Sequence, residues 1–183
     1  MVVRRRIGLL VPSTNSTGEP DFHMTVPDGV SVHSHHLWLD TSIVKPETID
    51  GMNSELAQGA RYLAPLLIEV ICMAGTTNSF YKGLSGSTWM ENQMREAAGV
   101  PAIASSPSVA MALSHFGAKR ISVATPYPKW SNERLKDYFT AAGLTDAKGH
   151  AYSKSGGEMP EEPTTDSEAR KSCGAGRMRL QEG

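Results

Sequence analysis

Residues 70–83 read VICMAGTTNSFYKG, an apolar run followed directly by a polar segment. The apolar run that enters this stretch, Ile68 to Ala74, predicts a short buried strand. Small and hydroxylated residues follow it, and a helical pattern returns only near Ser87, so we expect a polar loop at the C-terminal end of this strand. Ligands of open α/β sheets bind at the carboxyl ends of the strands. This loop is therefore the first candidate for a functional site.

The residue types in this loop suit an anionic ligand. Gly75 lets the backbone approach a ligand closely. Thr76, Thr77 and Ser79 offer hydroxyl groups beside free backbone N–H groups, which suits a carboxylate or an oxyanion. A glycine, serine and threonine turn without a function fits the same residues. The sequence alone leaves both interpretations open.

Composition excludes several classes of partner. A chain of 183 residues can bury one good core, or one and a half smaller lobes. Eighteen Lys and Arg residues against 19 Asp and Glu residues give a net charge of −1. Nothing electrostatic therefore indicates a nucleic-acid partner or an anionic membrane. No stretch approaches the roughly 18 to 20 apolar residues that a membrane-spanning helix needs.

Cysteine usage fits a reducing cytoplasm. Cys72 and Cys173 lie far apart in the sequence and show no metal-ligand spacing, which predicts neither a disulfide framework nor a zinc site. The apolar run Ile7 to Val11 is too short for the hydrophobic region of a signal peptide. We expect a soluble, cytoplasmic protein.

The same run, Ile7 to Val11, predicts a first buried strand, and a second polar loop follows it. In this loop Asn15 can orient a substrate carboxylate through its amide N–H groups, and Ser13 can assist. A helix N-cap or a turn is the alternative role for Asn15.

The segment Val30 to Leu39 alternates over part of its length and predicts a second strand. His33 and His35 would share one face of it, but no cysteine or carboxylate stands at ligand spacing beside them. We therefore interpret them as strand residues rather than metal ligands. Apolar residues at intervals of three or four predict one helix over Thr48 to Leu67.

Strands and helices continue to alternate along the chain. Further helices are expected over Thr88–Ala98, Ser108–Phe116 and Trp130–Ala142, and further strands over Val100–Ala104 and Arg120–Ala124. This order predicts an α/β fold with a mainly parallel sheet and helices on both faces. From Thr145 to Gly183 no apolar run exceeds two residues, so a largely disordered tail is expected there.

Three stretches resemble one known group of enzymes. Residues 6–17 (RIGLLVPSTNST) are similar to the opening of maleate cis–trans isomerases, and residues 73–83 (MAGTTNSFYKG) to the first active-site loop of arylmalonate decarboxylases. Residues 94–135 contain segments similar to both. Both groups belong to the aspartate/glutamate racemase superfamily, and the resemblance covers residues 6 to about 144.

The resemblance implies two similar flavodoxin-like α/β lobes, an active site in the cleft between them, and no cofactor. Racemases and isomerases of this superfamily place one catalytic cysteine on a loop of each lobe. In the decarboxylase branch a glycine replaces the cysteine of the first lobe. A single cysteine of the second lobe then protonates the enediolate that loss of CO₂ leaves behind.

Carried over by position, the resemblance assigns roles to five residues. Gly75 falls where the isomerases have their first cysteine. Thr76, Thr77 and Tyr127 fall on positions of the decarboxylase's carboxylate-binding pocket, and Asn15 on the isomerase asparagine that contacts substrate. For Tyr127 the alternative is a loop aromatic that packs between two prolines.

Two departures from the family pattern affect this interpretation. Cys72 lies within the predicted strand, where a free cysteine is usually a small buried hydrophobe, so we do not give it the missing catalytic role. The second lobe should continue beyond Leu144, but the composition after Thr145 offers no such lobe, as expected for a truncated or frame-shifted reading frame. Cys173 matches the family's cysteine–glycine pair, but charged residues precede it, which indicates a chance match. It would donate the proton only if the tail folded into the cleft.

The sequence thus predicts a first lobe over residues 1–117, the start of a second over 118–144 and a low-order tail over 145–183. The expected activity is a decarboxylase-like reaction beside a carboxylate of a small malonate-type diacid, with maleate isomerase or Asp/Glu racemase-like activity as the alternative. The rival from another class is an inactive remnant that binds a carboxylic acid, or associates with another copy through the surface that its missing lobe leaves bare.

Overall fold

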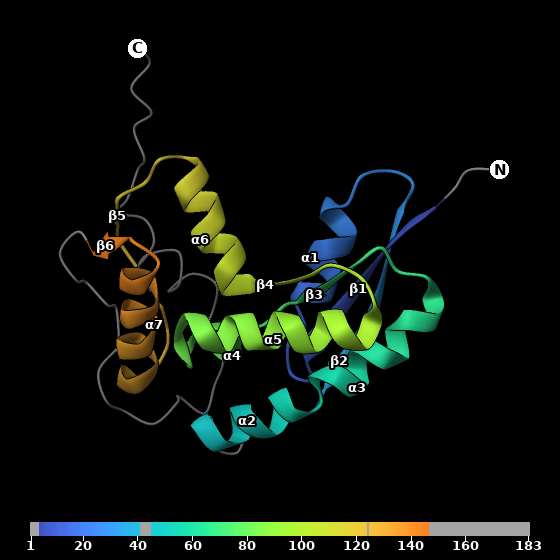
Figure 1. The fold of residues 1–183 in the computed structure, drawn as a ribbon, viewed down its shortest axis with the longest axis horizontal. Helices are drawn as coiled ribbons and strands as arrows, with labels where there is room; N and C mark the ends of the chain where they lie inside the picture. Colours follow the sequence, from blue (N-terminus) through green and yellow to red (C-terminus); the bar gives the residue numbers. More distant parts are fainter. Residues whose placement is uncertain (1–3, 41–44, 124, 147–183) are drawn as a thin grey trace, which may run out of the picture.

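The computed structural model describes residues 4–40, 45–123 and 125–146 of the chain. Its centre is a four-stranded parallel sheet with strand order β2-β1-β3-β4 (Figure 1). In chain order the elements are β1 (Arg5–Pro12), α1 (Gly18–Thr25), β2 (Val30–Leu37), α2 (Pro46–Ser54), α3 (Leu56–Leu63), the 3₁₀ turn η1 (Ala64–Leu66), β3 (Val70–Met73), α4 (Thr76–Phe80), α5 (Gly83–Ala98), β4 (Ala102–Ala104), α6 (Ser105–His115), β5 (Arg120–Ile121), α7 (Lys129–Ala141) and β6 (Thr145–Asp146). The predicted parallel α/β fold is confirmed.

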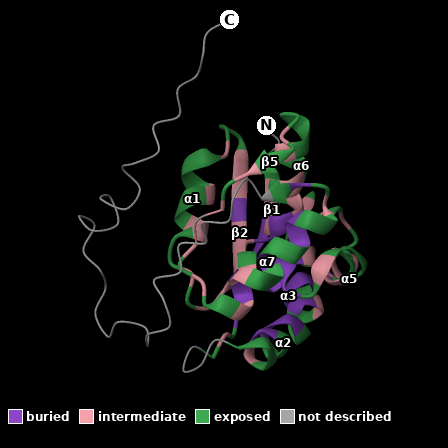
Figure 2. Cartoon of the chain, turned by 90° about the vertical axis from the view of Figure 1, so that its left-hand side faces the viewer, coloured by how far each residue is buried: buried purple, intermediate pink, exposed green. Residues whose placement is uncertain are grey.

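Strand β1 is buried on both faces, which explains its continuous apolar sequence. Leu9, Leu10 and Val11 are all fully buried. In the register, Leu9 stands beside Cys72 of β3 and Leu10 beside Met73. The edge strand β2 is less completely covered, and most of its residues have intermediate exposure (Figure 2). The inner strands therefore carry the core of the lobe.

Helix α1 covers one face of the sheet. Leu9, Val11 and Cys72 point to this side, where Phe22 and Val26 pack against them. Successive side chains of a strand point to opposite faces, so Leu10 points to the other side. Each face of β1 thus has its own hydrophobic cluster.

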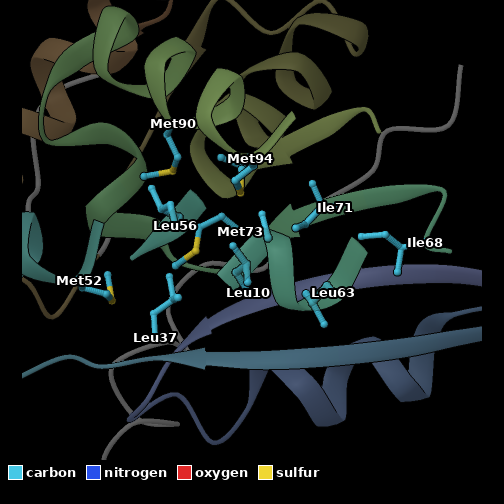
Figure 3. Packing of buried hydrophobic residues seen from close by; sticks show 12 residues of the cluster. Leu10, Leu37, Met52, Leu56, Leu63, Ile68, Ile71, Met73, Met90 and Met94 are labelled. Carbon is cyan, nitrogen blue, oxygen red and sulfur yellow. The ribbon is translucent and has the colours of Figure 1, made fainter. Parts of the chain in front are cut away.

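Helices α3 and α5 cover the opposite face. The residues of this cluster lie between the sheet and the two helices (Figure 3). Leu10 and Met73 come from the strands, Leu56 and Leu63 from α3, and Met94 from α5. Unbranched methionines fill irregular space between large side chains, and this cluster contains Met52, Met73, Met90 and Met94.

A third cluster joins α4 to the C-terminal elements. It contains Phe80 together with Leu135, Tyr138 and Phe139 of α7, and Leu144 beyond that helix. Strands β5 and β6 form a separate two-residue parallel pair. Whether these elements begin a second lobe stays a prediction. The tail predicted to be disordered lies, from residue 147 onward, outside the described residues, and so does Cys173.

Two expectations about helices were wrong. The helix predicted over Thr48 to Leu67 is divided into α2, α3 and η1, because Glu55 separates the two helices and Pro65 cannot continue an α-helix. The segment after Gly75, predicted as a loop up to Ser87, is helical in α4 and again from Gly83 onward. Two of the three buried side chains of α4, Asn78 and Ser79, are polar, so the apolar period that signals a helix is missing.

Candidate functional site

The sheet order places the loops after β1 and β3 side by side. From β1 the chain crosses to β2 on one side, and it returns past β1 to β3 on the other. The carboxyl ends of two strands at such a reversal form the usual ligand crevice of an open α/β sheet. Here the Ala74 N–H donates to the Leu10 carbonyl oxygen (2.8 Å), which holds the start of the β3 loop beside β1.

Asn15 connects the two loops through its side chain. Its amide nitrogen donates to the Ala74 carbonyl oxygen (3.2 Å), and its oxygen accepts from the N–H groups of Thr17 (3.1 Å) and Gly18 (2.8 Å). The oxygen therefore satisfies backbone donors of the turn that leads into α1, whose N-cap residue is Thr17, as the turn alternative predicts. A contact between Asn15 and substrate stays a prediction.

Ser13 fixes the loop after β1 to the end of β2. Its N–H donates to the Leu37 carbonyl oxygen (2.7 Å), and its hydroxyl oxygen accepts from the Leu39 N–H (3.0 Å). These bonds hold the loop in place. An assisting role of Ser13 toward a ligand stays a prediction.

Helix α4 begins directly after Gly75 at the carboxyl end of β3. The first N–H groups of a helix have no partner within the helix and lie at its positive end. Thr76 is exposed and Thr77 half-buried. Within residues 4–40, 45–123 and 125–146, neither threonine hydroxyl has a hydrogen-bond partner. The first turn of α4 thus presents backbone and hydroxyl donors to a ligand.

Ser105 and Ser106, which were not predicted as site residues, belong to α6 and support this turn. The hydroxyls of Ser79 and Ser106 lie 2.8 and 3.2 Å from the Thr76 carbonyl oxygen, and 2.8 Å from each other. The Ser105 hydroxyl donates to the Met73 carbonyl oxygen (3.1 Å). Residues 105–107 fall between the predicted strand Val100–Ala104 and the predicted helix Ser108–Phe116, but they form the start of α6. Their Ser-Ser-Pro sequence, which suits a helix start, was the available signal.

Tyr127 lies beside the same helix. Its ring centroid is 6.1 Å from that of Phe80, the last residue of α4. The Asn132 side chain holds the loop, because its amide nitrogen donates to the Tyr127 carbonyl oxygen (2.7 Å) and its oxygen accepts from the Thr125 hydroxyl. The ring packs on Phe80, and among the described residues the Tyr127 hydroxyl has no hydrogen-bond partner. The fold thus brings Tyr127 to the helix that carries Thr76 and Thr77.

Cys72 is not available as a nucleophile. It is buried among the residues that face α1, and burial raises the pKa of its thiol to about 11. The thiol is therefore neutral near pH 7, and the expectation of a small buried hydrophobe is confirmed. Cys173, the cysteine that the sequence offered as a proton donor, lies outside the described residues.

A polar pair lies behind the β3 loop and was also missed. The Asn78 amide nitrogen donates to the side-chain oxygen of Asn53 in α2 (3.1 Å), and both residues are buried. The Asn78 side-chain oxygen is buried with no hydrogen-bond partner among the described residues. Nothing in the local sequence marks this pair, because its members stand 25 positions apart.

A cavity of about 490 Å³ opens at the C-terminal end of α4. Its lining includes Asp50, Lys82, Trp130 and Arg134, but neither Thr76 nor Thr77. Asp50 accepts from the Tyr81 hydroxyl and pairs with the Lys82 ammonium. Burial alone would raise the pKa of Asp50, but Lys82 and Tyr81 outweigh it, so the pKa lies below the usual value. This charged cavity and the donor-rich first turn thus lie at opposite ends of one short helix.

The histidines of β2 have local partners. A ring nitrogen of His33 lies 3.1 Å from the Ser31 hydroxyl, and the His35 ring packs against Tyr62 at 5.2 Å between centroids. In the described part of the chain, no three His, Cys, Asp or Glu side chains are grouped to hold a metal ion. Nor does any helix there have the length and apolar character to cross a membrane.

The family model for arylmalonate decarboxylase matches residues 7–152 of this chain. The chain belongs to the arylmalonate decarboxylase family. It is 30% identical over 138 residues to an arylmalonate decarboxylase of Bordetella bronchiseptica, which covers 75% of this chain and 56% of the relative. It is 26% identical over 151 residues to a maleate isomerase of Pseudomonas putida, which covers 76% and 60%. The chain thus spans 56% to 60% of the length of these relatives.

Solved structures agree with this membership. A liganded mutant of arylmalonate decarboxylase superimposes with a TM-score of 0.69 at 27% identity, over 78% of this chain and 59% of the other. A mutant maleate cis–trans isomerase of Nocardia farcinica, with a covalently bound succinylcysteine intermediate, gives a TM-score of 0.69 at 27% identity, over 78% and 62%. The sequence resemblance to this branch and its α/β fold are therefore confirmed.

Proposed function

We propose that the loops after β1 and β3 bind one carboxylate of a small malonate-type diacid. The protein to which this lobe belongs then releases the other carboxylate as CO₂, without a cofactor. The observation that carries this proposal is the first turn of α4. It presents the backbone N–H groups and two hydroxyls of Thr76 and Thr77 at the carboxyl end of β3, with Tyr127 packed beside the same helix.

In this reaction the loop after β3 has to stabilise a developing negative charge. When the bond between the α-carbon and the departing carboxyl group breaks, its electron pair moves into the remaining carboxylate and forms an enediolate. Donors of Thr76, Thr77 and Tyr127 that face this group stabilise the added charge, and each is worth more where water is excluded. A proton from an acid then reaches the α-carbon and completes the product.

Gly75 favours decarboxylation over isomerisation. It provides no thiol that can add to a double bond, and the nearby Cys72 is neutral and buried. Maleate isomerisation is the second candidate, because the chain is also 25% to 28% identical to three maleate isomerases. Racemase-like activity would need the same missing thiol. The cofactor independence that the family resemblance implies, and the cytoplasmic location inferred from cysteine usage, are part of the proposal.

The acid that delivers the proton is the open part of this mechanism. Cys173 takes that role only if its segment reaches the bound diacid. Without such an acid, the lobe binds a carboxylate and turns nothing over, which is the third candidate. A Cys173→Ala variant separates these cases, because turnover that survives the substitution excludes Cys173 as the donor.

The test is an assay of the purified chain with phenylmalonate and with maleate, following CO₂ release, fumarate formation and binding by calorimetry. CO₂ release from phenylmalonate supports the proposal. Fumarate formation supports the isomerase candidate, and binding of phenylmalonate without turnover supports the carboxylate-binding lobe. A chain that binds neither diacid contradicts all three.

A further inference from the structure

Position 75 has no room for a side chain. A β-carbon built on Gly75 overlaps the side-chain oxygen of Asn78 and comes within 2.9 Å of the Met73 methyl group. The backbone of Gly75 is extended, with φ −143° and ψ 122°, so any residue type could adopt it. The requirement for glycine is therefore steric, and it arises from the neighbouring side chains.

Of the two neighbours, Asn78 is the one that cannot give way. The Met73 contact is the end of a flexible chain, which can move by rotation about its terminal bonds. Asn78 is only 6% exposed and donates to Asn53, which is itself 4% exposed. Turning the Asn78 amide away from Gly75 would break this bond and leave polar groups of both residues buried and unpaired.

Packing alone does not explain an asparagine here. An apolar side chain of similar size would fill the space without an unpaired oxygen, yet the Asn78 oxygen is buried with no partner among the described residues. The bond to Asn53 fixes the amide nitrogen on the α2 side, and this directs the oxygen toward Gly75. The pair thus holds an unpaired oxygen in the space that a side chain at position 75 would occupy.

We propose that Asn78, oriented by Asn53, reserves position 75 for glycine and so determines which reaction the site can perform. The loop after β3 then contributes backbone and hydroxyl donors but no side-chain acid or nucleophile at the residue before α4. Its consequence for the reaction rests on the proposed function. A thiol at position 75 would require Asn78 to be replaced as well.

A thermodynamic cycle on the purified chain tests this directly. The variants are Gly75→Ala, Asn78→Ala and both together, with Gly51→Ala as the matched control, because a β-carbon at Gly51 meets no atom within 4 Å. Overpacking at position 75 should lower the melting temperature by about 4 to 10 °C, whereas Gly51→Ala should not lower it. The double variant should melt no lower than Asn78→Ala alone.

The affinity for phenylmalonate provides a second readout. If Gly75→Ala acted only through a general loss of packing, the double variant would not recover the affinity. Gly75→Ala should weaken binding about tenfold through displacement of the α4 turn. Asn78→Ala should stay within about threefold of the parent, and the double variant should return to the level of Asn78→Ala.

Melting shifts that simply add, or a Gly75→Ala variant that melts like Gly51→Ala, would overturn the inference. If Gly75→Ala does not fold, a folded double variant supports it and an unfolded one contradicts it. If the parent binds no diacid, the proposed function fails, and the melting cycle alone still decides whether Asn78 excludes side chains at position 75.

Discussion

The two ends of α4 present opposite kinds of polar surface. The N-terminal end is uncharged, offers donors from Thr76 and Thr77, and is supported by bonds to the Thr76 carbonyl oxygen. The C-terminal end borders a charged cavity of about 490 Å³, but there Lys82 is already paired with Asp50. A cavity with charges is therefore a weaker guide to a carboxylate site than donors without partners at the end of a parallel strand.

The largest effect is expected at the residue that connects the two ends. Phe80 is fully buried and packs against Tyr127 and the α7 cluster. Phe80→Ala should lower the free energy of unfolding by about 3 to 5 kcal/mol. Phe116→Ala, whose side chain is 82% exposed, is the control and should change it by less than about 0.5 kcal/mol. Urea denaturation measures both, and equal losses would contradict the packing described for α4.

A paired comparison then separates the two ends as ligand sites. Thr76→Val keeps the shape of the side chain but removes its hydroxyl, and should weaken phenylmalonate binding about tenfold, as expected for a lost hydrogen bond to a charged group. Lys82→Met removes a charge at the other end and should change the affinity by less than about twofold. Calorimetric titration of both variants is the measurement. The reverse ranking would place the carboxylate in the charged cavity.

A smaller effect is expected from the support of the first turn. Ser106→Ala removes a hydroxyl that contacts Ser79 and the Thr76 carbonyl oxygen, and should cost about 1 kcal/mol of unfolding free energy. Ser114→Ala, at an exposed position of the same helix, is the matched control. If both variants unfold at the same urea concentration, the serine contacts do not stabilise the turn.

The smallest effect concerns the charged end. The folded state lowers the pKa of Asp50, so the unfolded chain takes up the proton first. The resulting stability is present at neutral pH and is lost as the pH falls through about 4 and below. Asp50 is about half exposed, so the effect should stay under about 1 kcal/mol. Urea denaturation of the parent and of Asp50→Asn should differ at pH 7, and the difference should shrink as the pH falls below about 4; an unchanged difference would contradict this role for the Asp50–Lys82 pair.

The sequence predicted the sheet better than the helices. Apolar runs such as Leu9 to Val11 identify strands buried on both faces, and they were read correctly. Helix α4 was missed because Asn78 and Ser79 occupy its buried side, so no apolar period marks it. The sequence indicated the loop after β3 as a candidate site, because glycine and threonine follow a strand directly there.

The contacts that organise the site were beyond the reach of sequence reasoning. Ser106 contacts Ser79 across 27 positions, and Asn53 contacts Asn78 across 25. No local pattern pairs residues at such distances, since the pairing depends on how α2, α4 and α6 pack. The sequence pointed to Gly75, Thr76 and Thr77 as candidate site residues but could not identify the buried side chains that contact this turn.

The most direct test of the account is a titration of the ¹⁵N-labelled chain with phenylmalonate, followed by amide chemical shifts. The largest shifts are expected at the N–H groups of Thr76 and Thr77, and small ones at Lys82 and Gly83 at the other end of α4. Largest shifts around Asp50, Lys82 and Arg134, with Thr76 and Thr77 unchanged, would contradict it and locate the anion in the charged cavity.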